Sequence, residues 1–90
     1  MEENIALKNY MEGYVEDLLP SVIRTMDICK CKRCRMDIAA YALNRLPPKY
    51  VVTDQGHMFA KLESFHSQFD VDIIKVITHG ASIIGANPKH

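Results

Sequence analysis

The C-terminal segment most constrains how this chain can fold, because it is apolar over more than one side. Residues 71–86 read VDIIKVITHGASIIGA, and in a helix their isoleucines, valines and alanines cover much more than a single stripe. A chain of 90 residues buries a smaller share of its surface than an average domain and often depends on a partner chain. The segment therefore predicts a homodimer that forms through helices. A compact monomer with this helix at its centre is the alternative.

Helical spacing also marks two earlier segments. Apolar residues recur at this spacing from Ile5 to Leu19, with Asn4 as the expected N-cap, and Pro20 is expected to kink or restart the helix. A second helix is expected from about residue 33 to residue 46, because the Pro47-Pro48 pair that follows pushes the preceding residue out of the helical region.

Between these helices and the last one, the pattern indicates a short β segment. We expect a strand at 50–53 (YVVT), a turn at 54–56 (DQG), a returning strand at 57–60 (HMFA) and a short helix at 61–69, with Asp70 capping the final helix. The fold class is therefore mainly α: a small domain of three to four helices with a short β-hairpin or strand, dimerising through helices.

Charge is balanced overall but unevenly placed. The formal net charge is zero, with acidic residues concentrated in 1–23 and basic residues in 24–49. This argues against broad nucleic-acid binding, which usually shows a basic excess over the whole domain, and favours one local anion site. No apolar run reaches the roughly 20 residues that cross a bilayer, and the acidic N-terminus lacks a signal-peptide core, so a cytoplasmic location is expected.

Three cysteines, Cys29, Cys31 and Cys34, form a C-x-C-x-x-C cluster. Thiolates are soft ligands suited to zinc or iron–sulfur chemistry, and structural zinc takes four ligands. The helix N-terminus and the basic side chains Lys30, Lys32, Arg33 and Arg35 are expected to favour the thiolates.

The local sequence offers no fourth thiol. The candidates are His57, His66, His79, His90, Asp27 or a group from a second chain. Reduced structural thiols are the main alternative to zinc, with redox or iron–sulfur use the remainder.

The segment CKCKRCRMDIAAYALNRLPPKYVVTDQG resembles the signature of the late competence development protein ComFB family. Its C-x-C-x-x-C cluster, D-I-x-A-x-A-L-N stretch and L-P-P-x-Y-V run match the family pattern, and KLESFHSQFDVDIIKVITHGASIIGANPKH is similar to the family's C-terminal half. The resemblance spans roughly residues 5–90 and implies a single ComFB-like domain over 1–90. It also implies a small helical dimeric bacterial protein, named after competence, without known enzymatic activity. Members of the family have been identified as receptors for cyclic di-GMP.

The residues themselves offer a face for such a ligand. A cyclic dinucleotide needs cations for its phosphates, a carboxylate or amide for guanine, and a flat group to stack on the base. In the helix over 33–46, suitable side chains fall on one face, and others lie near in sequence. The candidate ligand-binding residues are Arg33, Arg35, Asp37, Tyr41, Asn44, Arg45, Lys49 and Tyr50. The alternative is an ordinary solvated surface with one i,i+4 ion pair.

The sequence thus leaves two functions open. The first is a non-enzymatic dimeric regulator that binds cyclic di-GMP and signals to an unidentified protein partner. The second is a zinc-stabilised structural or adaptor protein that binds another protein and no nucleotide. No nucleophile–base pair or phosphate loop points to an enzyme.

Overall fold

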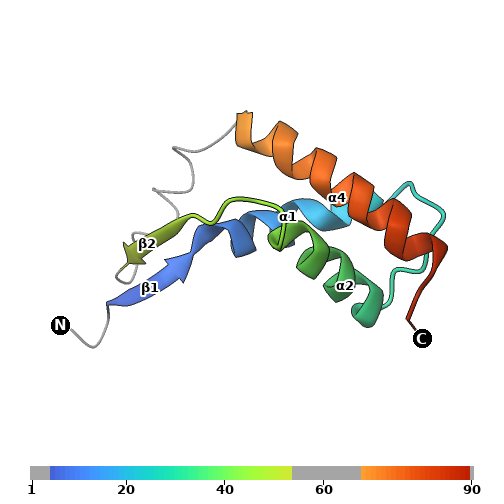
Figure 1. Cartoon of the computed structure of the whole chain (residues 1–90), viewed down its shortest axis with the longest axis horizontal. Helices are drawn as coiled ribbons and strands as arrows, with labels where there is room; N and C mark the ends of the chain where they lie inside the picture. The colour runs from blue at the N-terminus through green and yellow to red at the C-terminus, as the bar shows by residue number, and fades with distance from the viewer. Residues whose placement is uncertain (1–4, 54–67, 90) are drawn as a thin grey trace.

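Three helices and one pair of strands make up the structure, a computed structural model that describes residues 5–53 and 68–89 (Figure 1). In chain order the elements are β1 (Ala6–Asn9), α1 (Tyr10–Ile23), α2 (Lys32–Leu43), β2 (Tyr50–Thr53) and α4 (Gln68–Ala86). The mainly α class with a short β segment is confirmed. None of the described helices is both long and apolar enough to cross a membrane.

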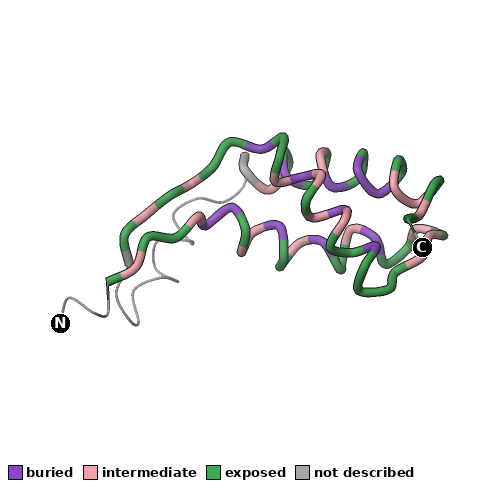
Figure 2. The backbone as a smooth tube through the Cα atoms, turned by 60° about the horizontal axis from the view of Figure 1, so that its bottom comes forward, coloured by how far each residue is buried: buried purple, intermediate pink, exposed green. Residues whose placement is uncertain are grey.

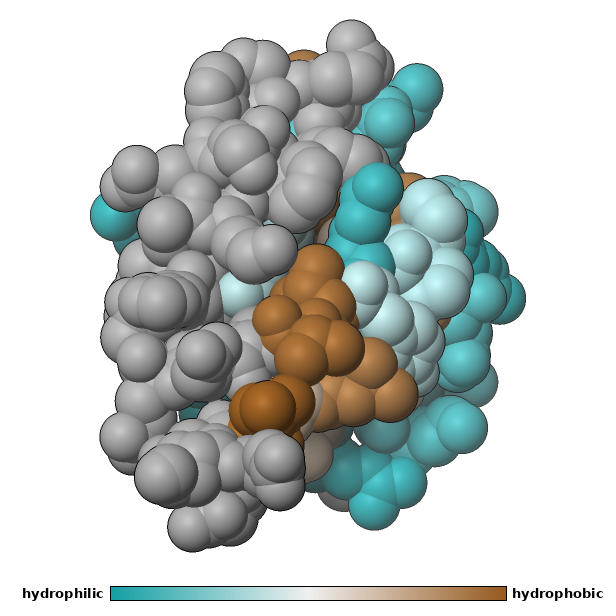
Figure 3. Space-filling model, turned by 90° about the vertical axis from the view of Figure 1, so that its left-hand side faces the viewer, coloured by the Kyte–Doolittle hydropathy of each residue, from teal (hydrophilic) through white to brown (hydrophobic). Residues whose placement is uncertain are grey.

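The strands pair in a way that the sequence pattern did not predict. β2 pairs antiparallel with β1, with Leu7 opposite Val52. Residues 6–9 are therefore a strand, and the prediction that they begin the first helix was wrong. The predicted returning strand at 57–60, the turn before it and most of the short helix after it lie outside the described residues. The strand pair exposes apolar side chains, Leu7 at 69% and Val52 at 59%, at the end of the molecule seen in Figure 3.

Asn9 explains where the strand stops and α1 begins. Its side-chain Oδ1 accepts the N–H of Met11 at 3.1 Å and the N–H of Lys49 at 2.8 Å. The first of these bonds caps α1, and the second ties the helix start to the residue before β2. The N-cap is therefore Asn9 and not Asn4, because the Asn9 side chain accepts the Met11 N–H and is also held by the N–H of Lys49.

Pro20 lies inside α1, which continues to Ile23. Of the kink or restart expected at this residue, the restart does not occur, and the kink stays a prediction. Proline removes the N–H that would bond to the carbonyl of Glu16, but Pro20 is exposed and only one turn from the helix end. The loss is therefore confined to one hydrogen bond near a terminus.

The core is a stripe along each of the three helices, which pack against one another (Figure 2). Spacings of three to four residues place these side chains on one face of each helix. The buried members are Met11, Val15, Leu19 and Ile23 from α1, Ile38 and Ala42 from α2, Leu46 just after it, and Ile73, Ile77 and Ala81 from α4. The helical prediction for 71–86 is confirmed, although α4 starts at Gln68, before the predicted cap.

The outer side of α4 is not enclosed by the described part of its own chain. Val71 is 55%, Ile74 39% and Ile83 48% exposed. These side chains are the part of the apolar surface that the three-helix core leaves unused. The homodimer predicted from this helix stays a prediction.

Gly80 allows α4 to approach α2 closely. It is buried, and a Cβ atom at this position would lie 2.5 Å from Cδ1 and 3.1 Å from Cγ of Tyr41. The close neighbour of Gly80 is thus the ring of Tyr41 in the same chain.

We predict that Gly80→Ala lowers the free energy of unfolding by about 1–3 kcal/mol, because the ring of Tyr41 must move out of its position. The matched control is Gly13→Ala in α1, where a Cβ has nothing within 4 Å. That change should be neutral or stabilising by up to about 1 kcal/mol, since alanine favours the helix. Urea unfolding of both variants measures the difference, and a Gly80→Ala protein as stable as the parent would contradict the packing.

Candidate metal and ligand site

α2 and the residues just before it carry the three cysteines, and α2 also carries four of the eight candidate ligand residues. Its buried stripe is narrow, with Cys34, Ile38 and Ala42 spaced four residues apart. The remaining sides of the helix are free for other contacts. The cysteines gather at its N-terminus, and a row of polar side chains follows along one side.

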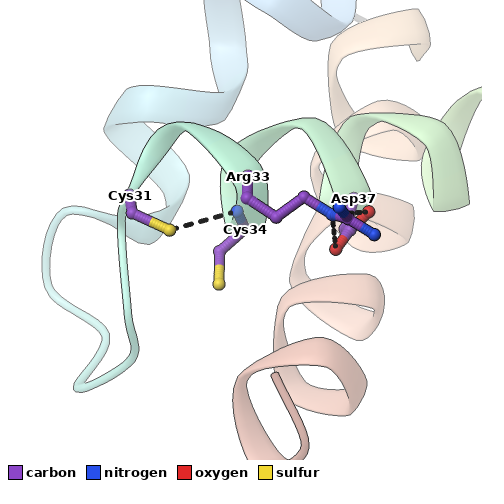
Figure 4. Close-up of polar contacts among 4 residues, drawn as sticks. All are labelled: Cys31, Arg33, Cys34 and Asp37. Carbon is purple, nitrogen blue, oxygen red and sulfur yellow. Dashed lines mark hydrogen bonds and ion pairs between the residues drawn. The ribbon is translucent and has the colours of Figure 1, made fainter. Parts of the chain in front are cut away.

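The three cysteines come together in space. Their sulfur atoms all lie within 4.8 Å of one another, with Cys29 half-buried, Cys31 exposed and Cys34 buried. Cys31 is the N-cap of α2, and its Sγ accepts the N–H of Cys34 at 3.5 Å (Figure 4). The predicted clustering of the C-x-C-x-x-C thiols is therefore confirmed.

The environment separates the thiols by acidity. The N–H of Cys34 lowers the pKa of Cys31 to about 7, opposed by some burial and helped by the neighbouring thiols and the Arg33 N–H. Burial, followed by the sulfurs of Cys29 and Cys31, raises the pKa of Cys34 to about 12. Of these two thiols, Cys31 ionises more readily, and Cys34 keeps its proton.

The basic side chains contribute less to this thiolate than the sequence suggested. Arg33 extends along the helix toward Asp37 and away from the two sulfurs (Figure 4). The Nζ of Lys30 donates to the carbonyls of Met26, at 2.5 Å, and Ile28. The stabilising charge therefore comes mainly from backbone N–H groups at the start of α2, as expected for a helix N-terminus.

The donor set fits a soft divalent metal such as zinc. Sulfurs bound to one tetrahedral zinc lie about 3.8 Å apart, because each Zn–S bond is about 2.3 Å, so these three need only a small contraction. Three thiolates so close together would repel one another, and this repulsion disfavours ionisation of all three at once. A bound cation would offset the repulsion. Among the described residues only the three thiols form the cluster. Asp27 and His79 are not part of it, and His57, His66 and His90 lie outside the described range.

On the polar side of α2, Arg33 and Asp37 form an ion pair. The Arg33 Nε lies 3.2 Å from Asp37 Oδ2, with the side chains 61% and 22% exposed. An exposed i,i+4 pair of this kind contributes only a few tenths of a kcal/mol. Little free energy is therefore lost when another group replaces the guanidinium or the carboxylate as the partner.

One helical turn further on, Tyr41 lies between two partners. The Arg45 guanidinium carbon sits 3.6 Å from the Tyr41 ring centroid, and Arg45 Nη1 donates to the Tyr41 carbonyl at 3.1 Å. The Tyr41 hydroxyl and His79 Nδ1 are 2.8 Å apart in a hydrogen bond that links α2 to α4. His79 is exposed in the single chain. No local pattern could have paired it with a residue 38 positions away.

The other candidate ligand residues are dispersed. Asn44 is the C-cap of α2 and donates its backbone N–H to Ala40 and Ala42 carbonyls. Lys49 and Tyr50 lie at the start of β2, where Tyr50 is exposed. Arg35 lines a groove between α1 and α2 instead of joining the polar side. The structure thus groups Arg33 with Asp37, and Tyr41 with Arg45, and places the others elsewhere.

Comparisons with known proteins agree with this fold. The model of the family described as "Late competence development protein ComFB" matches residues 8–88. The chain is 22% identical over 87 residues to the competence protein ComFB of Bacillus subtilis (strain 168), covering 97% of this chain and 82% of that protein. The solved structure of the late competence protein ComFB from Bacillus subtilis superposes with a TM-score of 0.79 at 24% identity, covering 93% of this chain and 96% of the other.

For the metal-free protein we predict that alkylation of Cys31 rises with pH around a midpoint of about 7, because the thiolate is the reactive form and its pKa is lowered to about 7. Cys34, with a raised pKa, should stay unreacted over the same range. Mass spectrometry after short exposure to iodoacetamide at each pH measures both sites.

Two additions make this experiment decisive. In denaturant the Cys31 midpoint should rise toward that of an ordinary thiol, since the cap is lost. One equivalent of zinc should protect all three cysteines in the folded protein. A folded midpoint no lower than the denatured one contradicts the cap, and alkylation unchanged by zinc contradicts the metal site.

Proposed function

The chain belongs to the late competence development protein ComFB family, and from that premise we propose a non-enzymatic bacterial regulatory protein that binds cyclic di-GMP as a homodimer. The bound form would signal to a protein partner. The observation that carries the proposal is the polar side of α2, where an arginine–aspartate pair and an arginine–tyrosine stack lie one turn apart.

These two pairs match the groups of a cyclic dinucleotide. The Arg45 guanidinium already lies over the Tyr41 ring, and its outer face can stack on a guanine. The Asp37 carboxylate can accept hydrogen bonds from the guanine edge, while Arg33, released from it, can bind a phosphate oxygen. Breaking the exposed ion pair between Arg33 and Asp37 costs little free energy. Most of the free energy of the new contacts with the ligand would therefore count toward binding.

Dimerisation follows from the surface that the chain leaves uncovered. Val71, Ile74 and Ile83 expose apolar area on α4, and Ile83 lies one turn beyond His79 on the same side of the helix. A two-fold dimer repeats every surface patch, so it would present two polar α2 faces to a ligand that is itself two-fold. The ligand would then stabilise the dimer by mass action.

A second candidate function rests on the thiol cluster. In this proposal the protein is a zinc-stabilised structural or adaptor protein that binds another protein and no nucleotide. The convergence of three sulfurs at the turn between α1 and α2 favours it, because a bound metal would fix that turn. Both candidates are compatible with a metal in the thiol cluster. They differ in whether the protein binds a nucleotide.

We predict that isothermal titration with cyclic di-GMP gives a Kd in the micromolar range or tighter. Arg33→Ala, Asp37→Ala and Arg45→Ala should each weaken binding by about tenfold or more, equivalent to about 1.4 kcal/mol, because each removes a charged or stacking partner. The matched control is Arg24→Ala, which removes the same charge from an exposed position at the end of α1. It should bind like the parent protein.

Cyclic di-AMP serves as the control ligand, since it keeps the phosphates and lacks the guanine edge. Native mass spectrometry of the same samples reports how many chains and zinc ions accompany the nucleotide. No heat and no thermal shift at about 100 μM ligand would exclude this function in favour of the adaptor.

A further inference from the structure

A groove of about 530 Å³ runs between α1 and α2 and takes no part in the site described above. Its middle is apolar, with Leu19 from α1 and Ala39 and Leu43 from α2. Seven of the ten described residues that line it are exposed, so the groove is open to solvent. Small-molecule pockets enclose most of their ligand, whereas an open groove between two helices suits an elongated segment.

The groove lies at the edge of the core, beside the buried stripe of α2. Ile38 and Ala42 are buried in the core shared with α1 and α4, Ala39 and Leu43 are half-buried at its edge, and Ala40 is exposed. α4 thus covers the α1–α2 pair from one side only. A helix in the groove would give a four-helix arrangement, with α4 and the partner helix on opposite sides of the α1–α2 pair.

The groove is acidic at one end and basic at the other. α1 and α2 run in opposite directions, as the chain colours of Figure 1 show. Glu12 and Glu16, near the start of α1, therefore lie at one end, and Lys32 and Arg35, at the start of α2, lie at the other. These four side chains are exposed, and within the described residues they form no ion pair with one another.

This charge order specifies a partner and its direction. Helices are most stable with acidic residues in their first turn and basic residues in their last. A helix of that kind would place its acidic N-terminus over Lys32 and Arg35 and its basic C-terminus over Glu12 and Glu16. It would supply the acidic charge that the first turn of α2 lacks.

We propose that the groove between α1 and α2 binds one amphipathic helix of a partner protein, acidic in its first turn, basic in its last, and antiparallel to α1. The groove residues span about 12–16 Å along each helix, which corresponds to about three turns of the partner. The proposal names the kind of partner that the proposed function requires, and it depends on that function only for the existence of a partner.

A second copy of this chain fits the groove less well. The exposed stripe of α4 starts with Val71 and Ile74 but continues with Thr78 and Ser82. Both hydroxyls bond to carbonyls of their own helix, at 2.7 and 3.1 Å. Half of this stripe is therefore polar where the floor of the groove is apolar.

The test uses a fluorescent synthetic helix of about four turns with leucines along one side, two glutamates in its first turn and two lysines in its last. Fluorescence anisotropy with the full chain, without nucleotide, should give a micromolar Kd. Ala40→Arg, which fills the groove from an exposed position on α2, should weaken binding at least tenfold. The matched control is Ala86→Arg, at an exposed alanine outside the groove, and it should have no effect.

Charge exchange tests the direction. Glu16→Lys should weaken binding of this peptide several-fold, and a peptide with glutamates in place of its last-turn lysines should recover binding to that variant. Absence of binding, or equal binding to the Ala40→Arg protein, would overturn the proposal. If Ala40→Arg instead turns a dimer into a monomer in native mass spectrometry, the groove belongs to a second copy, which also overturns it. Because no nucleotide is present, none of these outcomes depends on cyclic di-GMP.

Discussion

The narrow buried stripe of α2 is the constraint on which the rest of the structure depends. Cys34, Ile38 and Ala42 hold the helix against α1 and α4, and Gly80 lets α4 come close enough for the Tyr41 ring. Because so little of α2 is used in the core, its other sides stay available. Its N-terminus gathers the thiols, one side carries the arginine pairs, and another forms the groove. Cys34 is buried and also belongs to the thiol cluster, so a metal there would fix the start of α2.

The small size of the chain explains why so many surfaces remain open. A domain of 90 residues buries a smaller share of its surface than a larger one, and the three helices and two strands that the structure describes leave several apolar side chains exposed. The unused area is divided among the outer side of α4, the strand pair and the groove between α1 and α2. Each of these is a place where a second chain, a partner helix or a ligand could add to the stability of the fold.

The sequence predicts the helices and the thiol cluster because both depend on local spacing. Apolar residues three to four apart define α1, α2 and α4, and C-x-C-x-x-C spacing at a helix start is enough to bring three sulfurs together. Residues 6–9 were assigned to a helix because their strand partner lies more than 40 residues away in the sequence. Only that pairing, together with the two hydrogen bonds that Asn9 accepts, makes them a strand instead of a helix. The bond between Tyr41 and His79 and the opposite charges at the groove ends likewise join distant segments. Periodicity within one segment contains no information about such contacts.

The central claim is that α2 carries three separate sites, one at its N-terminus, one on its polar side and one on its groove side. Side-chain NMR of a single labelled sample, titrated in turn with zinc, cyclic di-GMP and the groove peptide, tests it most directly. The expected result is three separate sets of shifted signals: the cysteines for zinc, Tyr41 and His79 for the nucleotide, and Met36 and Leu43 for the peptide. If two of these additions shift the same set, or if all three shift every signal together, the sides of α2 do not act as separate sites and the claim is wrong.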